Sequence, residues 1–286
     1  MTEFVGRTAV VTGAGSGIGQ ALARQLAAAG ARLALSDIDE VGLAATVAQV
    51  RELGGEVRSE ILDVRDRAAM LDYAERVADR FGAVHLVINN AGVTFTGELT
   101  DTEFADLERV MAVNFWGVVH GTKAFLPHLI ASGDGRLVNI SSVFGLVAFP
   151  GQSAYSAAKF AVRGFTEAVR MEVRAAGHPV RVTCVCPGGV KTAIVRNSSA
   201  AAGIDVDVLA AAFDRDPGVT PVAAARTILS GVRAGRARVL VGRDAWLLDL
   251  AQRLLGPAYQ RLVGPEGGRL LEQIRRGPAD RLRETT

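Results

Sequence analysis

Tyr155 and Lys159 have the types and spacing that point most directly to proton-transfer chemistry. They stand four positions apart in a segment expected to be helical over residues 153–175, so both side chains should face the same way. A phenol with an ordinary pKa of about 10 is a poor base at neutral pH. A close ammonium group favours the phenolate, so we expect Lys159 to lower the pKa of Tyr155.

A glycine-rich turn lies between the first expected strand, residues 7–12, and the first expected helix, residues 17–29. In this context backbone N–H groups can contact a pyrophosphate at the helix N-terminus. The spacing reads T-G-x-x-x-G-x-G instead of G-x-G-x-x-G, because Ile18 takes the last glycine place. The residues expected to bind a dinucleotide here are Gly13, Gly15, Ser16, Gly17, Ile18 and Gly19.

Asp37 stands at the end of the second expected strand, residues 31–36. A carboxylate at this place can accept hydrogen bonds from the adenosine ribose hydroxyls and would repel a 2′-phosphate. Neither Ser16 nor Ile38 offers the positive charge that a 2′-phosphate needs. The sequence therefore favours NAD over NADP, with a helix-capping or turn role before Asp39 as the alternative for Asp37.

Strands and helices that could position these residues alternate along the chain. Strands apolar on both faces and joined by amphipathic helices indicate a doubly wound parallel sheet, an α/β fold. The expected strands are residues 7–12, 31–36, 56–62, 84–89, 135–141, 180–186 and 237–241. The expected helices are residues 17–29, 41–53, 66–81, about 101–130 and 153–175.

One domain is expected over residues 1–242, including a mobile substrate loop at about 190–221, and a C-terminal helical extension over 243–286. Five apolar residues of the extension form one helical stripe: Trp246, Leu247, Leu250, Leu254 and Leu255. We expect the extension to dock on the body or on a partner subunit. A lid over the substrate is an alternative, as is a membrane-surface helix with Arg243, Arg253 and Arg261 against anionic headgroups. The charged tail after Gly264 is expected to fray.

Composition narrows the function classes. The charge is balanced, with 32 Lys and Arg against 30 Asp and Glu, so no basic stripe indicates nucleic-acid binding. No apolar run is long enough for a membrane span, and no signal pattern opens the chain, so a cytoplasmic location is expected. Cys184 and Cys186 are expected to be buried thiols, the four histidines lack ligand spacing for a metal, and no G-x-S-x-G elbow marks a serine hydrolase.

Several further motifs follow the glycine turn in chain order. They are Asn89-Asn90-Ala91-Gly92, Asn114 within Val113-Asn114-Phe115-Trp116-Gly117, Ser142 after a strand, Tyr155-Ser156-Ala157-Ala158-Lys159, and Pro187-Gly188-Gly189 with Thr192. Each alone has a structural explanation, as a core, turn or surface residue. Together, from about residue 7 to residue 241, they make the sequence similar to the short-chain dehydrogenase/reductase family, whose fold is of the Rossmann type.

The resemblance implies a catalytic tetrad of Asn114, Ser142, Tyr155 and Lys159. Tyr155 would be the acid/base, Ser142 would bind the substrate oxygen, and Lys159 would hold the nicotinamide ribose. Asn114 would anchor a water that relays the proton. The resemblance also implies that cofactor contacts include Tyr155, Lys159, Asp63, Val64, Asn90, Ala91, Gly92, Pro187, Gly188, Val190 and Thr192.

The segments expected to line the substrate pocket are apolar. Residues 143–150 are almost wholly hydrophobic, and the loop at about 190–221 carries Ile194, Val195 and Phe213. We therefore expect an NAD(H)-dependent oxidoreductase acting on a hydrophobic secondary alcohol or its ketone, unless these residues pack the core or a subunit contact. The alternative function is a non-catalytic nucleotide-sensing or scaffold protein on the same fold. A homodimer or homotetramer is implied by the resemblance alone.

Overall fold

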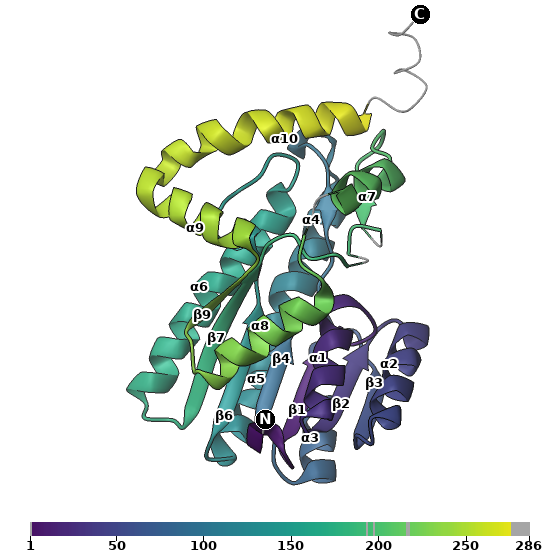
Figure 1. Ribbon diagram of the computed structural model, residues 1–286, viewed down its shortest axis with the longest axis vertical. Helices are drawn as coiled ribbons and strands as arrows, with labels where there is room; N and C mark the ends of the chain where they lie inside the picture. Colours follow the sequence, from purple (N-terminus) through teal and green to yellow (C-terminus); the bar gives the residue numbers. More distant parts are fainter. Residues whose placement is uncertain (1, 193, 197, 216–217, 276–286) are drawn as a thin grey trace, which may run out of the picture.

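The computed structural model describes residues 2–192, 194–196, 198–215 and 218–275. Its centre is a parallel sheet of seven strands in the order β3-β2-β1-β4-β6-β7-β9. These strands are β1 Thr8–Thr12, β2 Arg32–Asp37, β3 Val57–Ile61, β4 Leu86–Asn89, β6 Gly135–Ile140, β7 Val180–Pro187 and β9 Arg238–Val241. The architecture confirms the predicted doubly wound α/β fold in one domain (Figure 1).

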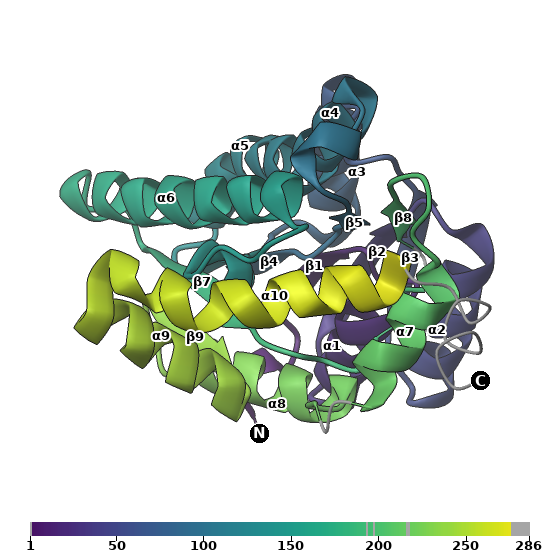
Figure 2. The ribbon, with the colours of Figure 1, turned by 90° about the horizontal axis from the view of Figure 1, so that it is seen from above.

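Helices cover both faces of the sheet (Figures 1 and 2). One face carries α1 Gly17–Ala28, α2 Glu40–Glu52 and α8 Pro221–Arg233, and the other carries α3 Arg67–Phe81, α5 Gly117–Ala131 and α6 Ser153–Ala175. Side-chain caps set where α2 and α3 begin. Asp39 accepts a hydrogen bond from the Gly42 N–H, and Asp66 accepts one from the Ala69 N–H. The bounds of the strands and of most helices lie close to those predicted from the sequence.

The helix predicted over residues 101–130 is not regular. It consists of α4 Phe104–Met111, a π-helical turn η3 Ala112–Trp116, and α5. At the end of η3 the Gly117 N–H donates to the Ala112 carbonyl, five residues back. Such a π turn inserts extra backbone into a helix and is frequent at functional sites. It is also where Asn114 lies.

Short elements stand above the carboxyl end of the sheet. The strands β5 Phe95–Thr96 and β8 Ser199–Ala200 pair in parallel, and the 3₁₀ turns are η2 Leu99–Asp101 and η4 Val143–Gly145. The predicted substrate loop contains β8 and the helix α7 Val206–Arg215, so it carries regular structure. Its residues 193, 197, 216 and 217 lie outside the described part of the chain.

The C-terminal extension forms α9 Arg243–Leu255, η5 Gly256–Tyr259 and α10 Gln260–Arg275. The prediction that the tail frays after Gly264 was wrong as far as Arg275, because Leu271 and Ile274 of α10 are buried and hold the helix in place. Residues 276–286 lie outside the described chain. In Figures 1 and 2, α10 crosses above the carboxyl ends of the strands, between α9 and α7.

The apolar stripe of α9 does not dock on the body. Trp246, Leu247, Leu250, Leu254 and Leu255 are between 44% and 74% exposed. The helix packs on the domain through a different face, which carries Ala245, Leu248 and Asp249. The extension therefore packs on the body, and these five residues of its stripe take no part in that contact. No helix in the described ranges has the length and apolar character needed to cross a membrane.

Candidate active site

The glycine turn lies where the strand order changes direction. The chain builds the sheet from β1 outward to β3 and then returns to β4 on the other side of β1. Ligands of doubly wound sheets bind outside the carboxyl ends of the strands at such a point. A Cβ on Gly19 would lie 2.0 Å from the Gly13 carbonyl oxygen, so only glycine allows this turn to close. Ser16, the N-cap of α1, makes no side-chain cap bond, so N–H groups of the first turn can bind a phosphate.

Asp37 reaches back from the end of β2 to the glycine turn. Its Oδ2 accepts a hydrogen bond from the Gly15 N–H at 2.7 Å, and its Oδ1 accepts one from the Asp39 N–H at 2.9 Å. The cap of α2 is Asp39 itself, so Asp37 is not the helix cap, while its bond to the Asp39 N–H is the turn contact that the alternative expected. Its carboxylate instead lies beside the glycine turn, where ribose hydroxyls would have an acceptor.

Asn90 ties the end of β4 to the glycine turn. Its Nδ2 donates to the carbonyl oxygens of Thr12 and Gly13, at 3.0 Å in each case. Thr12 Oγ1 accepts from the N–H groups of Asn90 and Ala91. Asn89 instead supports the sheet, donating through Nδ2 to Asn139 Oδ1 at 2.8 Å. Asn89 therefore supports the sheet, and Asn90 supports the glycine turn.

Asn114 is fully buried in the π turn and holds the segment after β4. Its Nδ2 donates to the Val93 and Val110 carbonyl oxygens at 2.8 and 3.0 Å, and its Oδ1 accepts from the Val93 N–H at 3.2 Å. Both amide hydrogens are therefore used by backbone, while Oδ1 keeps a free lone pair. A Cβ on Gly92 would lie 2.7 Å from that Oδ1 and 3.5 Å from Lys159 Nζ, so a side chain at Gly92 would fill the space beside both groups.

Two hydrogen bonds pin the first turns of α6 to the end of β6. Ser141 Oγ donates to the Lys159 carbonyl at 2.8 Å, and Lys159 Nζ donates to the Ile140 carbonyl at 3.1 Å. Ser142 Oγ accepts from the Phe144 N–H at 3.1 Å, which caps η4. These contacts place Ser142 and Lys159 at one end of the sheet, and a hydrogen bond between Ser142 and Tyr155 places Tyr155 with them.

Burial dominates the acid–base properties of the pair on α6. It raises the pKa of Tyr155 to about 12, against which a hydrogen bond with Ser142 acts in the lowering direction. It lowers the pKa of Lys159 to about 8. The expected lowering of the Tyr155 pKa by Lys159 was wrong for this structure, because the ammonium lies over the ring, 5.6 Å from its centroid, while burial penalises the phenolate.

Comparison with known proteins decides the family. The family model described as short chain dehydrogenase matches residues 7–203. The chain belongs to the short-chain dehydrogenase family. It is 57% identical over 264 residues to SadH of Mycobacterium tuberculosis, which covers 92% of this chain and 96% of SadH. It is 30% identical over 262 residues to estradiol 17-beta-dehydrogenase 11 of Mus musculus, covering 91% of this chain and 84% of that protein.

A solved structure of another short-chain dehydrogenase/reductase, from Burkholderia phymatum in complex with NAD, has the same fold. Its TM-score against this chain is 0.83 at 32% sequence identity, covering 89% of this chain and 95% of that one. The likeness therefore extends well beyond the segment that the family model matches.

Four of the expected cofactor-binding residues of this short-chain dehydrogenase lie around the same sheet end. Thr192 contacts the glycine turn, since a Cβ on Gly17 would lie 3.0 Å from Thr192 Cγ2. Gly188 donates its N–H to the Val241 carbonyl at 2.9 Å, which continues the pairing of β7 with β9. Pro187 ends β7, and Val190 is buried in a bridge to Val219.

Asp63 and Val64 are engaged with protein groups. Arg65 donates to both carboxylate oxygens of Asp63, at 2.6 to 3.0 Å, and these bonds hold the pKa of Asp63 below its usual value. Val64 packs in the core, and its carbonyl oxygen lies 3.0 Å from His120 Nδ1. An adenine contact of Asp63 would therefore be made by a carboxylate that Arg65 already orients.

The sequence argument missed two residues of the extension that contact this region. Asp244, in the first turn of α9, accepts from the Gly189 N–H at 2.6 Å through Oδ2. Tyr259, in η5, accepts from the Ala148 N–H at 2.8 Å. Neither residue belongs to a motif, and each meets a segment at least 55 positions away in sequence. Only the tertiary packing of α9 and η5 reveals them.

Within the described residues, no group of three or more His, Cys, Asp or Glu side chains is arranged to hold a metal ion. Cys184 and Cys186 are free, buried thiols, as expected for two small residues on one face of β7. The side chains of Tyr155, Lys159, Ser142 and Asn114 offer a phenol, an ammonium, a hydroxyl and an amide. This set can exchange a proton with a substrate and stabilise an alkoxide.

Proposed function

We propose that this chain is an NAD(H)-dependent oxidoreductase that interconverts an apolar secondary alcohol and its ketone, with Tyr155 as the acid/base. The observation that carries the proposal is the meeting of Ser142, Tyr155 and Lys159 at the carboxyl end of the sheet, the end at which the glycine turn also lies. Belonging to the short-chain dehydrogenase family supports the reaction class. The Burkholderia phymatum complex with NAD supports the cofactor.

The residues present fit NAD. The N-terminus of α1 offers N–H groups to the pyrophosphate, and Gly92 leaves space beside Asn114 and Lys159 for the nicotinamide ribose. The Asp37 carboxylate favours free ribose hydroxyls over a 2′-phosphate. NAD, when bound, supplies the carbon that accepts the hydride from the alcohol.

Tyr155 would take the hydroxyl proton as the hydride leaves the same substrate carbon, and would return a proton in ketone reduction. Burial raises the pKa of Tyr155, so its hydroxyl is protonated at neutral pH and can donate a proton in ketone reduction. In alcohol oxidation the phenolate would be a strong base, and Lys159 would supply positive charge close to it. Ser142 Oγ would donate a hydrogen bond to the substrate oxygen and stabilise its developing charge. The free lone pair of Asn114 Oδ1 would hold the water that relays the proton.

An aromatic surface beside Tyr155 supports an apolar substrate. Phe144 meets Tyr155 edge-on at 6.2 Å between ring centroids, and Phe144 and Phe149 stack at 5.4 Å. Val143, Leu146 and Val147 of the same segment are buried in the core, so their expected place in the pocket was wrong. The mouse relative's name, estradiol 17-beta-dehydrogenase 11, makes steroid alcohols suitable test compounds.

The test follows NADH formation from NAD and secondary alcohols graded from small and polar to bulky and apolar. We expect kcat/KM to rise roughly threefold to fourfold per added buried methylene until the pocket is filled. A marked preference for sugars or other polyols would contradict the apolar substrate. Tight NADH binding without turnover of any alcohol would instead support the nucleotide-sensing alternative.

We also propose that the chain forms a homodimer or homotetramer through α4 and α6. Exposed apolar side chains on or beside these helices support it: Phe104 at 80%, Trp116 at 51%, Phe160 at 39% and Met171 at 66%. Large apolar side chains gathered on helices of one face are typical of subunit contacts.

A further inference from the structure

Tyr259 joins the C-terminal extension to the loop that leads from Ser142 to α6. We call residues 143–151 the active-site loop. The Tyr259 side chain is buried among Val143, Leu146 and Val147 of that loop, and its hydroxyl oxygen accepts from the Ala148 N–H at 2.8 Å. This bond fixes the loop between its two aromatic residues, Phe144 and Phe149.

Helix α10 contacts the far end of the same loop. A Cβ on Gly267 would lie 2.6 Å from Pro150 Cδ, and a Cβ on Gly151 would lie 2.6 Å from Leu271 Cδ2. Leu271 is only 5% exposed. With α10 lying across the carboxyl ends of the strands (Figure 2), the helix covers the site from the side opposite the sheet.

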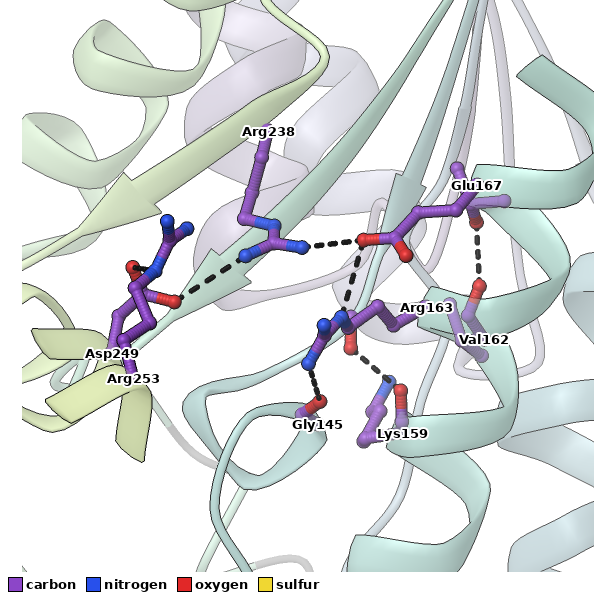
Figure 3. A network of polar contacts seen from close by, with 10 residues as sticks. Gly145, Lys159, Val162, Arg163, Glu167, Arg238, Asp249 and Arg253 are labelled. Atoms are coloured by element: carbon purple, nitrogen blue, oxygen red, sulfur yellow. Dashed lines mark hydrogen bonds and ion pairs between the residues drawn. The ribbon is translucent and has the colours of Figure 1, made fainter. Parts of the chain in front are cut away.

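A chain of charged groups gives a second connection from the extension to the loop (Figure 3). Asp249 of α9 accepts from Arg238 of β9 at 3.3 Å, and Arg238 also donates to Glu167 of α6. Glu167 accepts from Arg163 at 3.2 Å, and Arg163 donates to the Gly145 carbonyl at 3.3 Å. Burial acts to raise the pKa of Glu167, but the two arginines hold it below its usual value, so the link stays charged at neutral pH.

We propose that Tyr259 and Leu271 are positioning residues that hold the active-site loop and thereby set the preference of the site for bulky apolar alcohols. The inference rests on the proposed function. Both residues act through the loop: fixing Ala148 and Gly151 keeps Phe144 and Phe149 stacked beside Tyr155. A loose loop costs a large substrate more than a small one, because only the large one depends on contact with both rings.

Hydrogen–deuterium exchange of the free protein tests the anchoring contact without any turnover. In Tyr259→Phe we expect the Ala148 amide to exchange roughly 3- to 10-fold faster, since one neutral hydrogen bond is lost. The matched control is Tyr73→Phe, which removes a buried hydroxyl from α3, away from the loop. Unchanged exchange in Tyr259→Phe, or an equal rise in Tyr73→Phe, would overturn the anchoring role.

Kinetics tests the role in specificity. In Leu271→Ala the ratio of kcat/KM for a bulky alcohol to that for a small one should fall roughly tenfold, with the NADH dissociation constant unchanged. Leu262→Ala, at a 60% exposed position of the same helix, should keep the wild-type ratio. A wild-type ratio in Leu271→Ala would overturn the inference while leaving the oxidoreductase intact. A wild-type protein that oxidises no alcohol would overturn the proposed function and the size preference together. Hydrogen–deuterium exchange would then still test whether Tyr259 anchors Ala148.

Discussion

The carboxylate of Asp37 and the backbone N–H of Gly15 are joined by a hydrogen bond of 2.7 Å between segments 22 residues apart. The acid after β2 and the glycine turn after β1 therefore form one structural unit before any ligand binds. Within it, Asp37 Oδ1 and Oδ2 are both held in place by N–H donors, of Asp39 and Gly15. A preorganised acceptor loses little freedom on binding a ribose.

Replacing Asp37 should change the cofactor preference. In Asp37→Ser we expect NADH to bind roughly 10- to 100-fold more weakly, because hydrogen bonds to a charged acceptor are lost. The affinity for NADPH should rise, because the repulsion of its 2′-phosphate is removed. Titration of both cofactors by fluorescence measures this directly. As a control, Asp39→Ser should keep the cap of α2 and the wild-type preference; equal affinities of the wild-type protein for NADH and NADPH would contradict the assignment of Asp37.

The buried ammonium of Lys159 should lower the stability of the free protein at neutral pH. Burial lowers its pKa to about 8 from 10.5. Below pH 8 the folded and unfolded chains both carry the charge, so folding bears the full cost of burying it. Between pH 8 and 10.5 the unfolded chain keeps a proton that the folded chain has lost, so this group's contribution to the unfolding free energy rises with pH.

Lys159→Met should therefore stabilise the protein at pH 7. The lowered pKa of Lys159 corresponds to a cost of about 3 kcal/mol for burying its charge, which the variant avoids. The variant also loses the hydrogen bond to the Ile140 carbonyl, which costs about 1 kcal/mol. The net gain of about 2 kcal/mol should raise Tm by roughly 5 °C. Lys123→Met, at an exposed position of α5, is the control and should leave Tm unchanged. A lower Tm for Lys159→Met at pH 7, or a difference from wild type that does not shrink toward pH 10, would contradict this account.

Charges on the proposed subunit face should dissociate the oligomer. In the double variant Phe104→Glu and Met171→Glu we expect the dissociation constant to rise at least about 100-fold, because two carboxylates would lose water in an apolar contact. Analytical ultracentrifugation should find a dimer or tetramer for the wild type and a monomer for the variant. Val41→Glu with Leu53→Glu, at exposed positions in the first turn of α2 and directly after its last residue, is the matched control. A monomeric wild type would refute the proposal.

The strands and the main site motifs could be predicted because their signals are local. Every position of β1 is buried, and its centre is the apolar run Ala9-Val10-Val11 directly before the glycine turn. The spacing of Tyr155 and Lys159 places them on one face of any helix. The order of strands in the sheet has no such local signal, since it depends on how the helices pack on both faces.

The parts that sequence reasoning missed depend on tertiary contacts. The π turn around Asn114 interrupts a stretch whose apolar pattern suits one continuous helix. Helix α10 contains Pro265 and several glycines, which weaken a local prediction, and it is held by the burial of Leu271 and Ile274. On α9 the apolar stripe suggested the face that docks. The helix instead contacts the body through the face that carries Asp249, which accepts a hydrogen bond from Arg238.

The most direct test of the account compares wild type with Tyr155→Phe in two measurements on the same preparations: NADH formation from an apolar secondary alcohol, and the NADH dissociation constant. The variant keeps the ring that meets Phe144 and loses only the hydroxyl. We predict a fall in kcat of about 10²- to 10⁴-fold with cofactor affinity within about twofold of wild type. A variant that turns over alcohol at a near-normal rate would contradict the assignment of Tyr155 as the acid/base.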